Sequence, residues 1–271
     1  MTTVWAVYFS GTGTTERTVT HIAGELARLL AAPCRSLDFT RPQARQQELN
    51  FCQSDLVVLG TPVYAGRVPN VLLPFLREKV RGGGALAVPV VLFGNRNYDD
   101  ALIELRDILQ QDGFRVAAGA FVGEHSFSRT LGAGRPDDGD MAGQAAFARE
   151  ICEKLAGQAG TEMAPVSVRG ETPIRPYYTP RDRHGKPINI LKVKPKTRDT
   201  CTHCGLCAQV CPMGSISHEN VREYTGICIK CGACIKKCPK QARYYEDEGY
   251  LYHQHELEEG YTRRAAISLF L

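Results

Sequence analysis

The chain has 271 residues, enough for two domains, and its 33 basic and 29 acidic side chains leave a net charge of only +4. No apolar run reaches the roughly 18 residues that would span a bilayer, and no secretory signal precedes the apolar residues 4–9, so we expect a cytoplasmic protein without a membrane span. In that compartment disulfides are rare, so the 11 cysteines indicate bound metal instead.

The first 157 residues alternate apolar runs with helical patterns, which is typical of a parallel sheet flanked by helices. Buried strands are predicted at residues 4–10, 35–39, 56–62, 88–94 and 115–123. Helices are predicted at residues 15–30, 98–113 and 138–155. Together these elements make one complete α/β domain over residues 1–157.

The first strand leads directly into the first helix through residues 8–16, YFSGTGTTE. An anion bound there would meet free backbone N–H groups at a helix N-terminus. No lysine follows the glycines, and Glu16 stands where a dinucleotide-binding loop has its third glycine. A phosphate monoester is therefore the expected ligand, and its expected contacts are Ser10, Thr12, Gly13, Thr14 and Thr15.

Between residues 158 and 198 the periodic pattern stops, and six prolines oppose helix and sheet interiors. This predicted linker carries nine basic and three acidic side chains but no nucleic-acid-binding motif, so we expect no nucleic acid partner. Apolar residues such as Ile174 and Tyr178 favour a linker that lies on a protein surface. The final segment, residues 248–271, is predicted to be a tail that is helical over 255–271 and docks onto the rest.

Eight cysteines form a repeat between the linker and the tail. Residues 201–212 and 228–239 both read C-x2-C-x2-C-x3-C-P, with each cysteine matched 27 positions later. Three cysteines at this spacing can bind three irons of a cubane, and the fourth iron then takes the last cysteine of the other motif. We expect one [4Fe–4S] cluster on Cys201, Cys204, Cys207 and Cys238, and a second on Cys228, Cys231, Cys234 and Cys211.

Structural zinc on paired C-x2-C knuckles is the alternative. Zinc needs two spaced pairs of thiolates and has no use for the third cysteine of each motif or for the prolines that follow, Pro212 and Pro239. The spacing therefore favours two clusters.

The repeat resembles bacterial-type two-cluster ferredoxins over residues 199–247, and the Ser-x-Thr-Gly-x-Thr pattern at residues 10–15 resembles the phosphate loop of flavodoxins. Together they are similar to the flavodoxin–ferredoxin fusion proteins of anaerobic bacteria and archaea, over essentially the whole chain. The resemblance implies a flavodoxin-like doubly wound parallel sheet with strand order 2-1-3-4-5, which binds FMN. It also implies a small α+β ferredoxin domain that holds two [4Fe–4S] clusters.

The same resemblance implies that the loops after the third and fourth strands frame the FMN ring. Each of these loops supplies a tyrosine, Tyr64 or Tyr98, whose ring can stack on the flavin. The FMN contacts expected from the two loops are Thr61, Pro62, Val63, Tyr64, Ala65, Gly66, Gly94, Asn95, Arg96, Asn97, Tyr98 and Asp99.

FMN accepts two electrons and each cluster carries one, so we expect an electron-transfer protein that relays electrons between the clusters and the flavin. Its partners would be redox proteins, either a ferredoxin or an oxidoreductase. The alternative is an FMN-dependent reductase of a small organic substrate such as a quinone, a nitro compound or a corrinoid. Its acid–base candidates are Asp99, Asp100, Glu124 and His125, but we assign no catalytic residue. A homodimer that places the clusters of one chain beside the flavin of another stays open.

Overall fold

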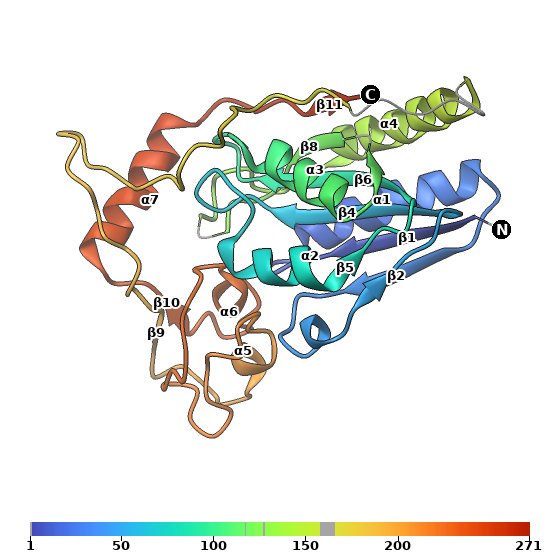
Figure 1. Cartoon of the computed structure of the whole chain (residues 1–271). Helices are drawn as coiled ribbons and strands as arrows, with labels where there is room; N and C mark the ends of the chain where they lie inside the picture. The colour runs from blue at the N-terminus through green and yellow to red at the C-terminus, as the bar shows by residue number, and fades with distance from the viewer. Residues whose placement is uncertain (1, 117, 127, 158–165) are drawn as a thin grey trace.

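We describe the chain from a computed structural model, over residues 2–116, 118–126, 128–157 and 166–271. Its larger part is a sheet between two layers of helices (Figure 1). The strands of this sheet are β1 (Thr3–Tyr8), β2 (Cys34–Asp38), β4 (Asp55–Pro62), β6 (Leu86–Phe93), β7 (Arg115–Val116), β8 (Ala118–Val122) and β11 (Ser268–Phe270).

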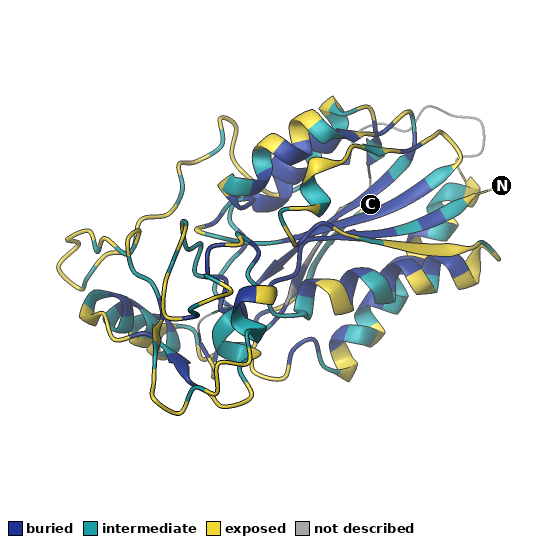
Figure 2. Ribbon diagram, turned by 90° about the horizontal axis from the view of Figure 1, so that it is seen from below, coloured by how far each residue is buried: buried dark blue, intermediate teal, exposed yellow. Residues whose placement is uncertain are grey.

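The parallel strands lie in the order β2-β1-β4-β6-β8, and the short β7 also pairs with β6. Counted along the chain without β7, this order is 2-1-3-4-5, so the predicted flavodoxin-like fold is confirmed. The central strands are buried on both faces, whereas the edge strand β2 is largely exposed (Figure 2). Burial on both faces explains why β4 and β6 read as unbroken apolar runs in the sequence.

Helices cover both faces of the sheet. α1 (Thr14–Leu29) and α4 (Asp138–Gly157) pack on one face through residues such as Ile22 and Phe147. α2 (Leu73–Lys79) and α3 (Ala101–Gln111) pack on the other through residues such as Phe75 and Leu105. The remaining short elements of this domain are η1 (Ala44–Gln46), β3 (Leu49–Asn50), η2 (Asn70–Leu72) and β5 (Val80–Arg81).

The cysteine repeats fold into a small α+β module. β9 (Lys196–Thr197) and β10 (Arg243–Tyr244) pair antiparallel, and each repeat contains one short helix, α5 (Leu206–Gln209) or α6 (Ala233–Lys236). The module lies beside the ends of the strands, at the lower left of Figure 1. Arg45 Nη2 donates to the Pro212 carbonyl at 2.7 Å, and Lys236 Nζ donates to Glu124 Oε2 at 3.0 Å. These contacts join the module to the sheet domain.

The predicted helix over residues 255–271 is wrong in its position and extent. α7 spans Glu248–Gly260, and the chain then runs extended to β11, which pairs antiparallel with β8. Without β11, the edge of β8 would expose unpaired backbone groups, and the backbone of Ser268–Phe270 satisfies them. The tail therefore docks onto the domain, but it does so as a strand.

The described part of the linker, residues 166–198, lies against its neighbours, as its apolar residues predict. Asp100 accepts hydrogen bonds from the backbone amides of Glu171, at 3.1 Å, and Arg175, at 2.8 Å, and also pairs with the Arg175 guanidinium. Tyr177 Oη donates to the Val68 carbonyl at 2.8 Å. Residues 158–165 lie outside the described residues, and the domain boundaries at 157, 198 and 247 stay predictions.

The ion pair between Asp100 and Arg175 predicts a pH-dependent stability. The hydrogen bond from Arg175 lowers the pKa of Asp100 to about 2, whereas an unfolded aspartate titrates near 4. The stabilisation is thus present above about pH 4 and is lost as the pH falls through about 2. Since the Arg175 side chain is 44% exposed, we expect Arg175→Met to cost about 1–2 kcal/mol of unfolding free energy at pH 7. Urea unfolding of the apoprotein at pH 7 and near pH 3 measures this cost, and an equal cost at both pH values contradicts the assignment.

Gly232 and Gly205 provide a matched test of how the module is held. Both begin a short helix of their repeat with φ of +74°. A Cβ on Gly232 would lie 1.8 Å from the Ser126 carbonyl oxygen, whereas a Cβ on Gly205 would meet nothing within 4 Å. Each alanine variant should lose about 1 kcal/mol through the left-handed backbone, but only Gly232→Ala should also loosen the module. We expect faster limited proteolysis and a lower melting temperature for Gly232→Ala than for Gly205→Ala. Identical behaviour of the two variants would show that the contact of Gly232 with Ser126 does not hold the module in place.

Candidate functional site

Two cavities in the small module are each lined by four cysteines. The outer cavity is lined by Cys201, Cys204, Cys207 and Cys238, and the inner cavity by Cys211, Cys228, Cys231 and Cys234. Each cavity takes three cysteines from one repeat and the fourth from the other, which is the grouping that the sequence predicts. Their empty volumes are about 340 and 360 Å³, as expected if the same kind of group fills both.

The placement of the thiols suits a cubane better than a single ion. A zinc site needs four ligand atoms within about 2.3 Å of one ion. Among the described residues, no three His, Cys, Asp or Glu side chains form such a group. The cysteines instead stand around the walls of a cavity, as they would around a larger cluster.

Backbone amides already point at the sulfurs. Ser215 N donates to Cys211 Sγ at 3.4 Å, Lys230 N to Cys228 Sγ at 3.4 Å, and Ala242 N to Cys238 Sγ at 3.3 Å. Burial, in contrast, raises the pKa of the Cys231 thiol and raises that of Cys234 to about 12. A site in which some sulfurs receive N–H donors and other, buried thiols resist ionisation fits one whose charge is completed by iron.

The inner cavity adjoins the loop between β1 and α1. A Cβ on Gly11 would lie 3.2 Å from Cys231 Cβ and 3.6 Å from Cys231 Sγ. Tyr64 lies on the same side, because burial and then the nearby Cys231 and Cys228 raise its pKa well above the usual value. The predicted cluster site and the predicted flavin loops therefore meet within one chain.

The loop at residues 10–15 fits a phosphate group. Gly13 is the N-cap of α1 with φ of 100° and offers no side chain to cap it. Ser10 Oγ accepts from Gly13 N at 3.2 Å and from Glu16 N at 3.1 Å. The backbone N–H groups of Thr14 and Thr15 lie in the first turn of the helix and have no intrahelical acceptor, so a bound anion can accept their hydrogen bonds.

The loop after β4 forms a tight turn at the carboxyl end of the sheet. Tyr64 and Arg67 exchange backbone hydrogen bonds at 3.0 and 3.1 Å, and Ala65 and Gly66 between them have positive φ. Thr61, at the end of β4, is fully buried, and its hydroxyl has no hydrogen-bond partner among the described residues. Since buried hydroxyls are normally paired, this one is an unused donor and acceptor beside the predicted flavin loops. Pro62 and Val63 join Thr61 to the turn, and Val63 N donates to the Leu92 carbonyl at 2.8 Å.

The loop after β6 is engaged with other parts of the protein. Asn95 Nδ2 donates to the carbonyls of Tyr261 and Arg263, both at 2.7 Å, and Asn95 Oδ1 accepts from Ala265 N at 3.0 Å. Tyr98 is 4% exposed and packs in the core, 5.5 Å from the Phe93 ring. The structure thus does not bring Tyr98 together with Tyr64.

The other residues of this loop contact one another or the adjacent loop. Arg96 pairs with Asp99, and Asn97 Oδ1 accepts from Asp99 N at 3.0 Å. Gly94 lies against His125, since a Cβ would stand 2.5 Å from its ring. The expected FMN contacts of residues 94–99 stay a prediction.

The four acid–base candidates are all engaged or neutral. Asp99 pairs with Arg96, Asp100 with Arg175, and Glu124 with Lys236. Burial, helped by Lys236, lowers the pKa of His125 to about 3, so this histidine is neutral at pH 7. Among these residues no carboxylate stands ready beside a base for proton transfer.

A buried charged residue at the cluster sites is not predicted from the sequence. Arg243 is 2% exposed and lines the outer cavity. Its only sequence signal is a mismatch between the repeats, since the position 27 residues earlier is Ile216.

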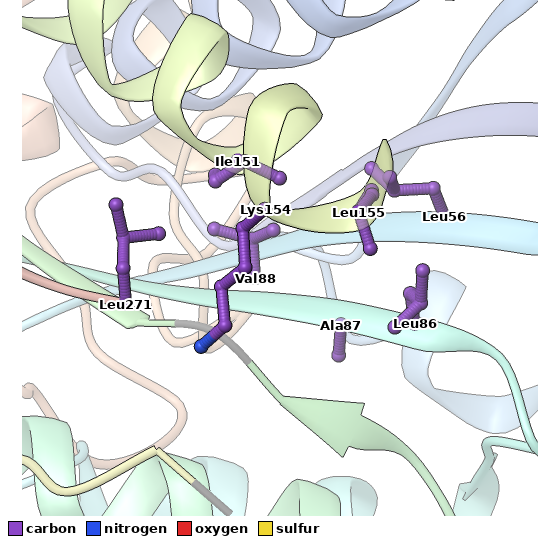
Figure 3. Close-up of a pocket in the computed structure, with 8 residues that line it drawn as sticks. All are labelled: Leu56, Leu86, Ala87, Val88, Ile151, Lys154, Leu155 and Leu271. Atoms are coloured by element: carbon purple, nitrogen blue, oxygen red, sulfur yellow. The ribbon is translucent and has the colours of Figure 1, made fainter. Parts of the chain in front are cut away.

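A further cavity lies at the opposite end of the sheet (Figure 3). It is lined by Leu56, Leu86, Ala87, Val88, Ile151, Lys154, Leu155 and Leu271. Ligands of open α/β sheets bind at the carboxyl ends of the strands, whereas Leu56 and Leu86 begin β4 and β6. With one polar side chain, Lys154, in its wall, this cavity is a packing gap and not a cofactor site.

No helix in the described ranges is both long and apolar enough to cross a bilayer.

Comparisons with known proteins agree with this division. Residues 194–239 match the family of 4Fe-4S dicluster domains. No curated protein matches the sequence. Similar solved structures include a short-chain flavodoxin associated with a non-canonical PDU bacterial microcompartment, at 17% identity over 57% of this chain and 99% of that one, with a TM-score of 0.42. A flavodoxin from the domain Archaea is similar at 14% identity over 58% of this chain and 99% of that one, with a TM-score of 0.42.

The strand order, the cysteine cavities and the dicluster match lead to one conclusion. The chain combines an α/β domain that has the flavodoxin-like strand order with a 4Fe-4S dicluster domain.

Proposed function

We propose that the protein is an electron carrier in which two [4Fe–4S] clusters and one FMN form a relay within a single chain. The observation that carries this proposal is the approach of Cys231, in the inner cavity, to Gly11 in the phosphate loop. Because the rate of electron tunnelling falls steeply with distance, this close approach favours electron transfer between the inner cluster and the flavin. Bound in these sites, each cluster supplies one-electron chemistry and FMN two-electron chemistry, so the capacities match.

The exposure of the two cavities gives the relay its order. Cys204 in the outer cavity is exposed, whereas Cys231 in the inner cavity is buried. A partner can therefore reach the outer cavity from solvent, and the inner cavity stands between it and the flavin loops. The partner is a redox protein such as a ferredoxin or an oxidoreductase. The exposed Lys240 in the wall of the outer cavity favours an acidic partner surface.

The reductase alternative receives less support. Reduction of a quinone or a nitro compound at the flavin needs a proton donor beside the ring. Asp99, Asp100 and Glu124 are held in ion pairs, and the lowered pKa of His125 keeps it neutral. The described residues thus offer a path for electrons but no evident source of protons.

Two cysteine variants test the relay. Anaerobically reconstituted wild-type protein should hold about eight irons and one FMN per chain. Cys204→Ala and Cys231→Ala should each lose about four irons, but only Cys231→Ala should slow flavin reduction by a cluster, followed by stopped-flow absorbance. Fewer than about four irons in the wild type, or equal flavin kinetics in the two variants, contradicts the proposed order.

A change at Thr61 tests the flavin site separately. Thr61→Val removes a hydroxyl that has no partner among the described residues, so the apoprotein should keep its stability. If that hydroxyl bonds to FMN, the variant should bind FMN about fivefold more weakly, as loss of roughly 1 kcal/mol implies. Ser10→Ala is the comparison, because Ser10 Oγ accepts two backbone hydrogen bonds and its loss should also destabilise the apoprotein. Unchanged FMN affinity in Thr61→Val, measured by flavin fluorescence, would remove Thr61 from the site.

A further inference from the structure

The two cysteine repeats differ at one buried position. Ile216 and Arg243 are each the fifth residue after the last cysteine of their repeat, and they are 3% and 2% exposed. Ile216 lines the inner cavity and Arg243 lines the outer cavity. Two otherwise matching sites therefore have an apolar wall in one case and a guanidinium in the other.

Arg243 has neutral hydrogen-bond partners. Its Nη1 donates to the Val221 carbonyl at 2.7 Å and to Thr197 Oγ1, and its Nη2 donates to Tyr224 Oη. Its Nε is buried and has no partner among the described residues. Among the described residues, no carboxylate forms an ion pair with Arg243, although a buried cation is costly to leave uncompensated.

Cysteine sulfurs are the groups near this cation that can become anionic, among the described residues whose pKa it affects. The guanidinium opposes the effect of burial on the pKa of Cys207, in the outer cavity, and on that of Cys234, in the inner cavity. A cubane with four thiolate ligands is negatively charged, and it becomes more so when it gains an electron. A nearby positive charge therefore favours the reduced form and raises the reduction potential.

We propose that Arg243 is the built-in counter-ion of the outer cluster and sets its reduction potential above that of the inner cluster. Its Nε–H has no acceptor among the described residues, so it can donate to a sulfur of a bound cluster. This inference rests on the proposed function only in requiring that both clusters are present. Arg243 acts by position rather than by chemistry, because its charge determines which of the two clusters is reduced first.

Another cation lies near the inner cavity. Lys230 Nζ donates to the carbonyls of Leu191, at 2.6 Å, and Cys228, at 3.1 Å. Lys230 is only partly buried, so solvent screens its charge more than that of Arg243. The repeat places His203 at the matching position of the outer site, which makes Lys230→His a natural control.

The experiment is a redox titration of the reconstituted full chain, followed by EPR. Hyperfine-shifted NMR signals of the cysteine β-protons assign each potential to its cluster. In the wild type the outer cluster should have the higher potential. Arg243→Gln, which keeps hydrogen-bond donors but loses the charge, should lower the outer potential more than the inner one, while Arg243→Lys should largely restore it. Lys230→His should shift the outer potential less than Arg243→Gln does.

Equal or reversed potentials in the wild type, or an unchanged outer potential in Arg243→Gln, would overturn the proposal. Equal or reversed wild-type potentials overturn the proposal even if Arg243→Gln fails to retain its clusters. Iron analysis separates the two hypotheses. Iron for fewer than two clusters refutes the proposed function, whereas two clusters with ungraded potentials refute the role of Arg243 alone.

Discussion

The packing of Cys231 and Gly232 against the loops of the sheet domain is the contact on which the remaining arrangement depends. Gly11 and Gly232 bring no side chain into this interface. Cys231 can therefore pack directly against Gly11, and the Ser126 carbonyl against Gly232. The bonds from Arg45 to Pro212 and from Lys236 to Glu124 flank it. A larger residue at Gly232 would overlap the Ser126 carbonyl, and one at Gly11 would crowd Cys231, because packed interiors leave no spare room.

The chain holds this interface from both ends of the module. Before the module, the linker is tied to α3 and its neighbouring loop through Asp100 and Arg175. After it, Asn95 receives the tail segment around Tyr261–Ala265, and β11 joins the sheet. A carrier tethered by a free linker would sample many cluster-to-flavin distances. Anchoring on both sides makes that distance a property of the fold.

Short-range patterns predicted much of this structure, and long-range contacts account for what they missed. The buried strands and the grouping of the eight cysteines follow from apolar runs and ligand spacing, which are local signals, whereas the strand order is implied by the resemblance to flavodoxins. The tail was misjudged because its last residues pair with β8, a partner more than 140 positions away that no local helical pattern reveals. Tyr98 and Asn95 stand in the expected loop, but the core and the tail occupy their side chains. Arg243 escaped notice because arginine is seldom buried, and only its place in the folded repeat shows that it is.

The antiparallel pairing of β11 with β8 gives the chain an unexpected connectivity. The cysteine module is not appended after a finished domain; it is inserted between the fifth parallel strand and the last strand of the same sheet. On the ribosome, the sheet therefore stays open at one margin until both iron-binding loops have been synthesised. A shortage of iron that leaves those loops unstructured would also hinder the final strand from reaching its place, so the exposed β8 margin could recruit other chains. In this way the pairing of β11 makes the solubility of the sheet domain depend on the supply of iron.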